Sequence, residues 1–262
     1  SSHNGKNFWS ASSKRAASDD KPIIQIDSEG KQPMKKALAL ITYARAHYFE
    51  LVLASVLEQM VDGKPVKETY DLHIFQDGLW TGETDENKAG HARISNRLEE
   101  LPPDIKVYRQ GENLGVAFHF DFIEKLLFVE KNYDFVIFCE DDLILAPGYV
   151  ETVDAMGEKF HDDPRIGMVS AHPGDSTTTL ENQRANPGKY VHMDHNWAFG
   201  LTRTFWAKRQ PFVEHYLDLI RDKPYRERPN DLIYRWLELC GFKGSASSQD
   251  YIKQCATTGL GA

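Results

Sequence analysis

An apolar run that ends in three acidic residues limits the fold of this chain more than any other feature. Residues 135–139 (Phe-Val-Ile-Phe-Cys) are all apolar, and Glu140, Asp141 and Asp142 follow them directly. A short run of this kind is typical of a strand that is buried on both faces, as in the centre of a parallel sheet. Three adjacent carboxylates repel one another and resist burial, so a cation is expected to compensate them. The two hypotheses are a divalent metal site and a solvated acidic turn.

The composition narrows the class of protein. The 262 residues are 41% hydrophobic and carry a net charge of −8, as expected for one large globular domain with a core. There is no basic stripe of the kind that nucleic-acid scaffolds carry, and the three widely spaced cysteines form neither a zinc motif nor a disulfide framework. No apolar run is long enough to cross a membrane, and no signal peptide is visible. We therefore expect a soluble domain in the cytoplasm or at a membrane surface rather than a secreted protein.

Residues 1–35 differ from the rest of the chain and are predicted to be a flexible polar tail, with one short strand at 23–26. Residues 36–262 form the predicted domain. Its apolar patterns predict strands at 37–43, 70–75, 105–108, 135–139, 166–170, 190–193 and 197–202. They predict helices at 48–60, 117–129, 149–160, 204–221, 232–240 and 251–258.

The alternation of strands and helices predicts an α/β fold, with an open, mainly parallel twisted sheet that helices cover on both faces. Ligands on such Rossmann-like sheets bind beyond the carboxyl ends of the strands. Arg45 follows the first predicted strand, Asp77 follows the second, and the acidic triplet follows the fourth. This shared position favours a ligand site over a solvated turn.

The order of these features resembles GT-A fold glycosyltransferases, which use nucleotide-sugar donors. The acids stand where that family has its DXD motif. The segment Glu140-Asp141-Asp142-Leu143-Ile144-Leu145-Ala146-Pro147-Gly148-Tyr149 is similar to the corresponding segment of the N-acetylglucosaminyltransferases of N-glycan branching, and the wider pattern resembles glycosyltransferase family 2-like enzymes. The resemblance covers residues 36–262. It implies a nucleotide-sugar-binding half at 36–150 and an acceptor-binding half at 151–262.

The resemblance implies a role for each acid of the triplet. Asp142 would ligate Mn²⁺ or Mg²⁺, and the metal would bridge the diphosphate of the donor and stabilise the charge on the leaving nucleotide. Asp141 and Glu140 would contact the ribose and the sugar of the donor.

Four further residues are expected at the nucleotide by the same resemblance. Asp77 would accept a hydrogen bond from the N–H of a base such as uracil, and Arg45, Asn113 and His119 would lie beside the nucleotide. Each has a structural alternative: Asp77-Gly78 and Asn113-Leu114-Gly115 are turn signals, Arg45 a surface residue and His119 a core histidine.

The second half of the domain is expected to hold the acceptor. The segment 192–200 is dense in histidine and aromatic residues, and Trp197 is suited to stack on the apolar face of a sugar. The alternating His192, Asp194 and His195 suit an acceptor contact or a late metal ligand. The alternative is an edge strand whose Trp197 and Phe199 pack inwards.

Inverting transfer needs a base that takes the proton of the acceptor hydroxyl. In resembling enzymes an Asp at the start of a helix supplies it, and both Asp231 and Asp250 fit that position. Neither follows a Glu as in the motif of the family; Asn230 and Gln249 stand there instead. An N-cap Asp that stabilises its helix by about 1 kcal/mol is the alternative for each. The distance from Trp206 favours Asp231, whereas the small residues at 244–248 favour Asp250.

The chain is therefore expected to be a metal-dependent, inverting hexosyl- or N-acetylhexosaminyltransferase that uses a UDP-sugar. Its partners would be the nucleotide-sugar donor and a glycan or glycoconjugate acceptor. Two alternatives remain at this point. One is a sugar-phosphate nucleotidyltransferase, although residues 42–47 lack the glycine-rich loop that such enzymes have. The other is a catalytically inactive glycosyltransferase-like binding domain.

Overall fold

The computed structural model describes residues 33–172, 179–193 and 195–262. Within this part, the main sheet has six strands: β1 (Lys36–Thr42), β4 (Asp71–Gln76), β5 (Lys106–Arg109), β6 (Phe135–Glu140), β7 (Met168–Val169) and β8 (Phe199–Thr202). Their order in the sheet is β5-β4-β1-β6-β8-β7. A separate two-stranded hairpin consists of β2 (Met60–Val61) and β3 (Lys64–Pro65).

The sheet is mainly parallel, which confirms the predicted fold class. β1 pairs in parallel with both β4 and β6, and β4 pairs in parallel with β5. β8 runs antiparallel to β6, and β7 runs antiparallel to β8. From β1 the chain builds the sheet first towards β4 and β5, and then towards β6 on the other side. The carboxyl ends of β1, β4 and β6 therefore meet at the topological switch point, where ligands of open α/β sheets bind.

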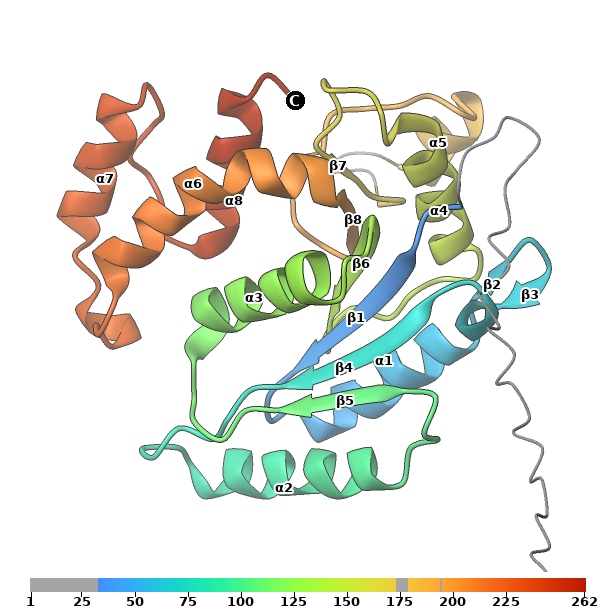
Figure 1. Ribbon diagram of the computed structural model, residues 1–262, viewed down its shortest axis with the longest axis horizontal. Helices are drawn as coiled ribbons and strands as arrows, with labels where there is room; N and C mark the ends of the chain where they lie inside the picture. The colour runs from blue at the N-terminus through green and yellow to red at the C-terminus, as the bar shows by residue number, and fades with distance from the viewer. Residues whose placement is uncertain (1–32, 173–178, 194) are drawn as a thin grey trace, which may run out of the picture. The chain divides into compact units, whose positions relative to one another are not determined.

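Helices cover both faces of the sheet (Figure 1). The α-helices are α1 (Ala46–Leu57), α2 (Asp85–Glu99), α3 (Gly115–Lys125), α4 (Tyr149–Phe160), α5 (Leu180–Ala185), α6 (Arg203–Ile220), α7 (Asn230–Leu239) and α8 (Gln249–Gly259). Shorter helical segments are the 3₁₀ turns η1 (Val66–Glu68) and η3 (Tyr225–Glu227) and the π turn η2 (Leu126–Glu130), which continues α3.

The alternation of side chains along β1 explains why its sequence is continuously apolar. Leu38 and Leu40 belong to a core with α1, α2 and α4, whereas Ala37, Ala39 and Ile41 belong to a core with α3 and α6. Successive side chains of a strand point to opposite faces, so a strand between two helical layers needs apolar residues at every position. A third core joins α6, α7 and α8.

The structure corrects several predicted elements. Residues 190–193 form no strand, and the strand predicted at 166–170 shortens to the two residues of β7. Helix α2 was not predicted, because only Ile94 and Leu98 of its 15 residues are buried and its apolar periodicity is weak. The strand predicted at 23–26 lies outside the described residues.

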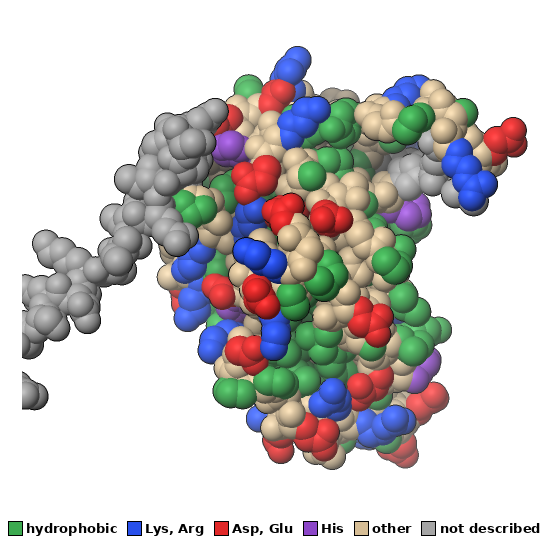
Figure 2. Space-filling model, turned by 90° about the vertical axis from the view of Figure 1, so that its right-hand side faces the viewer, with side chains coloured by type: hydrophobic (Ala, Val, Ile, Leu, Met, Phe, Trp, Pro, Cys, Tyr) green, Lys and Arg blue, Asp and Glu red, His purple; other side chains and the backbone are tan. Residues whose placement is uncertain are grey.

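The surface gives two further observations. None of the described helices has both the length and the apolar character that crossing a bilayer requires. Figure 2 shows acidic and basic side chains interspersed over the face that it presents. That face therefore presents no field of a single sign.

Candidate functional site

The acidic triplet lies at the switch point, beside the residues that follow β1. Glu140 is the last residue of β6, and Asp141 and Asp142 form the turn after it. The guanidinium of Arg45 contacts both aspartates, with Nη2 at 2.5 Å from Asp141 Oδ1 and Nη1 at 2.8 Å from Asp142 Oδ2. The guanidinium of Arg45 therefore compensates part of the negative charge of the triplet.

The three acids have different surroundings. Asp141 is buried, and its Oδ2 accepts hydrogen bonds from Thr42 Oγ1 at 2.6 Å and from the backbone N–H of Tyr43 at 3.3 Å. This carboxylate thus ties the end of β6 to the end of β1. Asp142, by contrast, has a side chain that is 42% exposed, with Arg45 as its ion-pair partner. Asp142 is the carboxylate of the triplet that is open to a ligand.

Glu140 faces a second acid from the far end of the chain. Burial raises the pKa of Glu140 to about 7, and the charges of Asp250, Asp142 and Asp141 add to the shift, while Arg45 opposes it. Burial also raises the pKa of Asp250, against the influence of Lys253 and Asn196. Asp250 is the second residue of α8. The charge of a carboxylate at the start of α8 therefore acts on the last residue of β6, 110 residues away in sequence.

The raised pKa of Glu140 makes a testable prediction for stability. A carboxyl group whose pKa is higher in the folded state binds more protons there, so stability falls as pH rises from about 4.5 to about 7. This shift corresponds to about 3 kcal/mol. Glu140→Gln should therefore flatten the pH dependence of the unfolding free energy and be more stable than the native chain at pH 8. Urea denaturation at pH 5 and pH 8 measures this, with the exposed Glu130→Gln as control; equal slopes for all three proteins would contradict it.

The triplet offers a metal ion one exposed carboxylate, that of Asp142. Among residues 33–172, 179–193 and 195–262, no group of three or more His, Cys, Asp or Glu side chains is placed to hold a metal ion. The bonds of Asp141 lie within the chain, which leaves Asp142 as the exposed oxygen donor. One carboxylate suits Mg²⁺ or Mn²⁺ when phosphates and water supply the other ligands. The triplet therefore fits a metal that arrives with a diphosphate.

Asp77 and Asn113 organise the turn that begins α3. Asp77 Oδ1 accepts from the backbone N–H groups of Gly78 and Leu114, and Oδ2 accepts from Gly115 N–H and from Asn113 Nδ2. These four bonds match the acceptor capacity of a carboxylate. A Cβ at Gly78 would lie 2.2 Å from the backbone of Glu112, so the turn also requires glycine there. Asp77 is thus shown as the anchor of this turn, and its contact with a nucleotide base stays a prediction.

His119 is a buried histidine of α3. It is 2% exposed, and burial lowers its pKa although the charge of Asp77 opposes the shift. Its Nε2 has no hydrogen-bond partner in the part of the chain that the structure describes. A contact of His119 with the nucleotide stays a prediction.

The aromatic segment before β8 lies beside Asp250. Trp197 is 52% exposed and its ring stacks on that of His195, with centroids 5.1 Å apart. His195 bonds through both ring nitrogens, to the N–H of Trp197 and to the carbonyl of His172, so these bonds leave it unsuited to ligate a metal. Asn196 Nδ2 donates to the backbone oxygen of Asp250 at 3.0 Å. Asp194 lies outside the described residues.

Two buried amide oxygens border the same acid. Neither Asn196 Oδ1 nor Gln249 Oε1 has a partner among the described residues, although both side chains are at least nine-tenths buried. Gln249 Nε2 donates to the carboxylate of Asp250. Buried acceptors of this kind usually find a donor.

The two candidate bases, Asp231 and Asp250, lie in different surroundings. Asp231 is exposed on α7, which packs on α6 through Ile233 and Leu237. Asp250 is half-buried and adds its charge to that of the triplet. The structure thus brings together Arg45, Asp141 and Asp142, next to Glu140. The charge of Asp250 acts on Glu140, whereas Asp231 is not among the groups that do so.

One element of the site was not predicted from the sequence. The carboxylate of Glu124 in α3 bonds to Arg209 of α6 and to Lys253 of α8, each at 2.7 Å, and the three side chains are at most 2% exposed. This buried network anchors α8 one turn after Asp250. In the sequence, the network could have been suspected because Glu124, Arg209 and Lys253 each interrupt the apolar face of a predicted helix.

A search of curated proteins finds a distant glycosyltransferase relative, whereas no family model matches the chain. The chain is 24% identical over 160 residues to an α-1,3-mannosyl-glycoprotein 2-β-N-acetylglucosaminyltransferase of Arabidopsis thaliana. The match covers 58% of this chain and 34% of the relative, so the chain spans about a third of the length of that protein.

Solved structures of similar arrangement include two nucleotide-binding enzymes. A mannosyltransferase from Pyrobaculum calidifontis, in complex with GDP-Man and Mn²⁺, has 18% identity and a TM-score of 0.37, over 58% of this chain and 39% of its own. A cytidylyltransferase from Leptospira borgpetersenii has 14% identity and a TM-score of 0.37, over 79% and 72%. The sheet with its acids at the switch point, together with the sequence similarity, supports a nucleotide-sugar glycosyltransferase-like fold.

Proposed function

We propose that the chain is a metal-dependent, inverting glycosyltransferase that moves a sugar from a UDP-sugar to a hydroxyl group of a glycan or glycoconjugate. The observation that carries the proposal is that Asp142 is exposed at the switch point while the charge of Asp250 acts on the neighbouring Glu140; an exposed carboxylate for a metal and a second carboxylate for a proton would then share one site. The resemblance of the triplet and the distant N-acetylglucosaminyltransferase relative support the class of reaction.

The donor would bind at the carboxyl ends of β1, β4 and β6. Asp142 would hold Mn²⁺ or Mg²⁺ against the diphosphate, where the metal would offset the charge that develops on the leaving nucleotide. The guanidinium of Arg45 is 44% exposed and suits a bidentate contact with a phosphate. Glu140 and Asp141 lie next to these residues and would face the sugar and the ribose.

The acceptor would approach from the side of α8. The carboxylate of Asp250 would take the proton of the attacking hydroxyl, and its raised pKa brings its basicity closer to neutral pH. Trp197 would stack on the sugar ring, and the amide oxygens of Asn196 and Gln249 would accept bonds from its hydroxyl groups. Attack opposite to the leaving nucleotide then inverts the anomeric centre.

Nucleotide binding tests the metal assignment. UDP should bind to the native chain in the presence of Mn²⁺ and much more weakly in the presence of EDTA, as measured by calorimetry. Asp142→Ala should lose at least about tenfold in metal-linked affinity, because one carboxylate–metal bond is removed. Asp104→Ala, which removes an exposed acid before β5, is the control of equal charge. Metal-linked binding that survives in Asp142→Ala would refute the assignment.

A thermal-shift panel identifies the donor and separates the alternatives. A nucleotide sugar at 100 times its dissociation constant should stabilise the chain by about 2.7 kcal/mol. Stabilisation by UTP or CTP but by no nucleotide sugar would indicate nucleotidyl transfer instead. An inactive binding domain would bind a glycan without any metal-linked response to nucleotides.

A further inference from the structure

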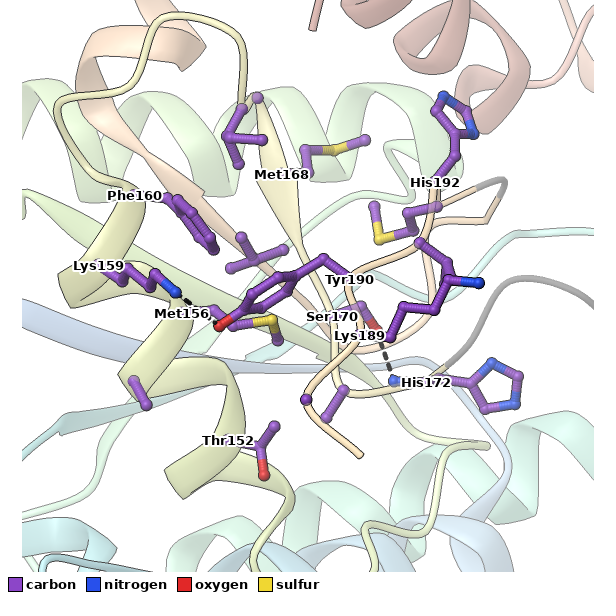
Figure 3. A pocket seen from close by; sticks show the side chains of 18 of the residues that line it. Thr152, Met156, Lys159, Phe160, Met168, Ser170, His172, Lys189, Tyr190 and His192 are labelled. Carbon is purple, nitrogen blue, oxygen red and sulfur yellow. Dashed lines mark hydrogen bonds between the residues drawn. The ribbon is translucent and has the colours of Figure 1, made fainter. Parts of the chain in front are cut away.

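A large cavity lies against α4 and β7. Its volume is about 1150 Å³. Its walls are the exposed face of α4, β7 with the residues that flank it, the segment 186–193, Thr257 of α8, and Ala262. Figure 3 shows Tyr190 reaching across towards Met156, Phe160 and Lys159 of α4. Ligand pockets typically have about 300–1,000 Å³, so the cavity has room for a sizeable molecule.

The lining of this cavity suits a hydrocarbon. Three of the five methionines of the chain, Met156, Met168 and Met193, line it together with further apolar residues. Methionine side chains are flexible and polarizable, so they adapt to ligands of irregular shape. Tyr190 and Val191 are 55% and 57% exposed there. A bound apolar group would remove this apolar surface from water.

Charged groups lie beside the apolar lining. Lys159 Nζ is 4.7 Å from the ring centroid of Tyr190 and donates to its hydroxyl group. Arg165 pairs with Asp163. Glu151 and Lys189 also line the cavity, so charges of both signs border it. An uncharged chain can pack on the apolar lining without breaking the pair of Arg165 with Asp163.

The cavity connects with the candidate site through a continuous set of side-chain contacts. His172, which lines the cavity, packs edge-on against His195 and Trp197, with ring centroids 5.0 Å and 5.4 Å away. Asn196, between these two residues, donates to the backbone of Asp250. A molecule whose polar end reaches Asp250 and whose apolar end enters the cavity would cross this aromatic cluster.

We propose that the cavity binds a hydrocarbon chain attached to the acceptor sugar, so that the acceptor is an amphiphilic glycoside. The assignment of the sugar end rests on the proposed glycosyl transfer. The binding of the hydrocarbon end depends on the cavity alone.

Alkyl glucosides of increasing length, from methyl to octyl, test this proposal by calorimetry below their critical micelle concentrations. Affinity should rise with length, by up to about fourfold for each methylene that is buried. Ala155→Trp, on the exposed face of α4 that lines the cavity, should abolish this dependence. Ala54→Trp places the same ring on the exposed face of α1, outside the cavity, and should keep it.

A second variant, Val191→Asp, tests the cavity independently in case Ala155→Trp does not fold. Val191→Asp adds a charge to an exposed loop position and should weaken octyl glucoside more than methyl glucoside. Affinity that does not depend on length in the native chain, or a dependence that both variants retain, would overturn the proposal.

The outcome is separable from that of the proposed function, because these titrations contain neither nucleotide nor metal. Asp142→Ala should therefore keep the dependence on chain length. A chain that binds alkyl glucosides in this way but shows no metal-linked UDP binding would refute the proposed function and leave the hydrocarbon site standing.

Discussion

Asp250→Asn should lower kcat for sugar transfer by about 10³-fold, because a general base typically contributes about 10²–10⁴-fold to the rate. The substitution keeps the size of the side chain and removes its basicity. Metal-linked UDP binding should stay within about threefold of the native value, since the metal is assigned to Asp142. Steady-state kinetics with the donor found in the thermal-shift panel, and a parallel UDP titration, measure the two effects.

Asp231→Asn is the matched control for this experiment. Asp231 also stands in the first turn of a helix, but it is exposed on α7. Its substitution should leave kcat near the native value. A large loss in Asp231→Asn with a small one in Asp250→Asn would reverse the assignment, and near-native rates in both would show that neither acid is the base.

The sequence alone could not distinguish Asp231 from Asp250 as the candidate base. Each follows a polar residue and precedes an apolar helical pattern, so the local sequence treats them alike. What separates them is that the charge of Asp250, in α8, acts on Glu140 at the end of β6, 110 residues away in sequence, and that of Asp231 does not appear among the influences on Glu140. The pairing of Arg45 with Asp141 and Asp142 joins residues that are 96 and 97 positions apart, so the local sequence does not reveal it either.

Other parts of the fold followed from local patterns. β1 and β6 were predicted because strands between two helical layers are apolar along nearly their whole length, and the position of the acids followed from the end of β6. Residues 190–193 have strand-forming side chains but no strand partner among the residues that the structure describes. A strand needs a neighbour, and no local pattern supplies that information.

The buried network on Glu124 carries the largest predicted effect on stability. Burial opposes ionisation of this carboxyl group, but Arg209 and Lys253 outweigh it and hold its pKa below the usual value. Glu124→Ala would leave two buried cations without their shared partner. Breaking a buried ion pair in this way costs about 3–5 kcal/mol, so we expect a loss of that size in urea denaturation at pH 7.

Two further variants test whether the loss of stability in Glu124→Ala comes from the buried charges. Glu214→Ala removes an exposed acid that pairs with Lys125, and it should change stability by less than about 1 kcal/mol. Lys253→Met keeps an apolar stem in place and leaves Glu124 paired with Arg209 alone, so it should be less destabilising than Glu124→Ala. A loss below about 1 kcal/mol in Glu124→Ala would contradict the role of the network. Since Lys253 lies one turn after Asp250, a loosened α8 should also lower kcat in Lys253→Met while UDP binding persists.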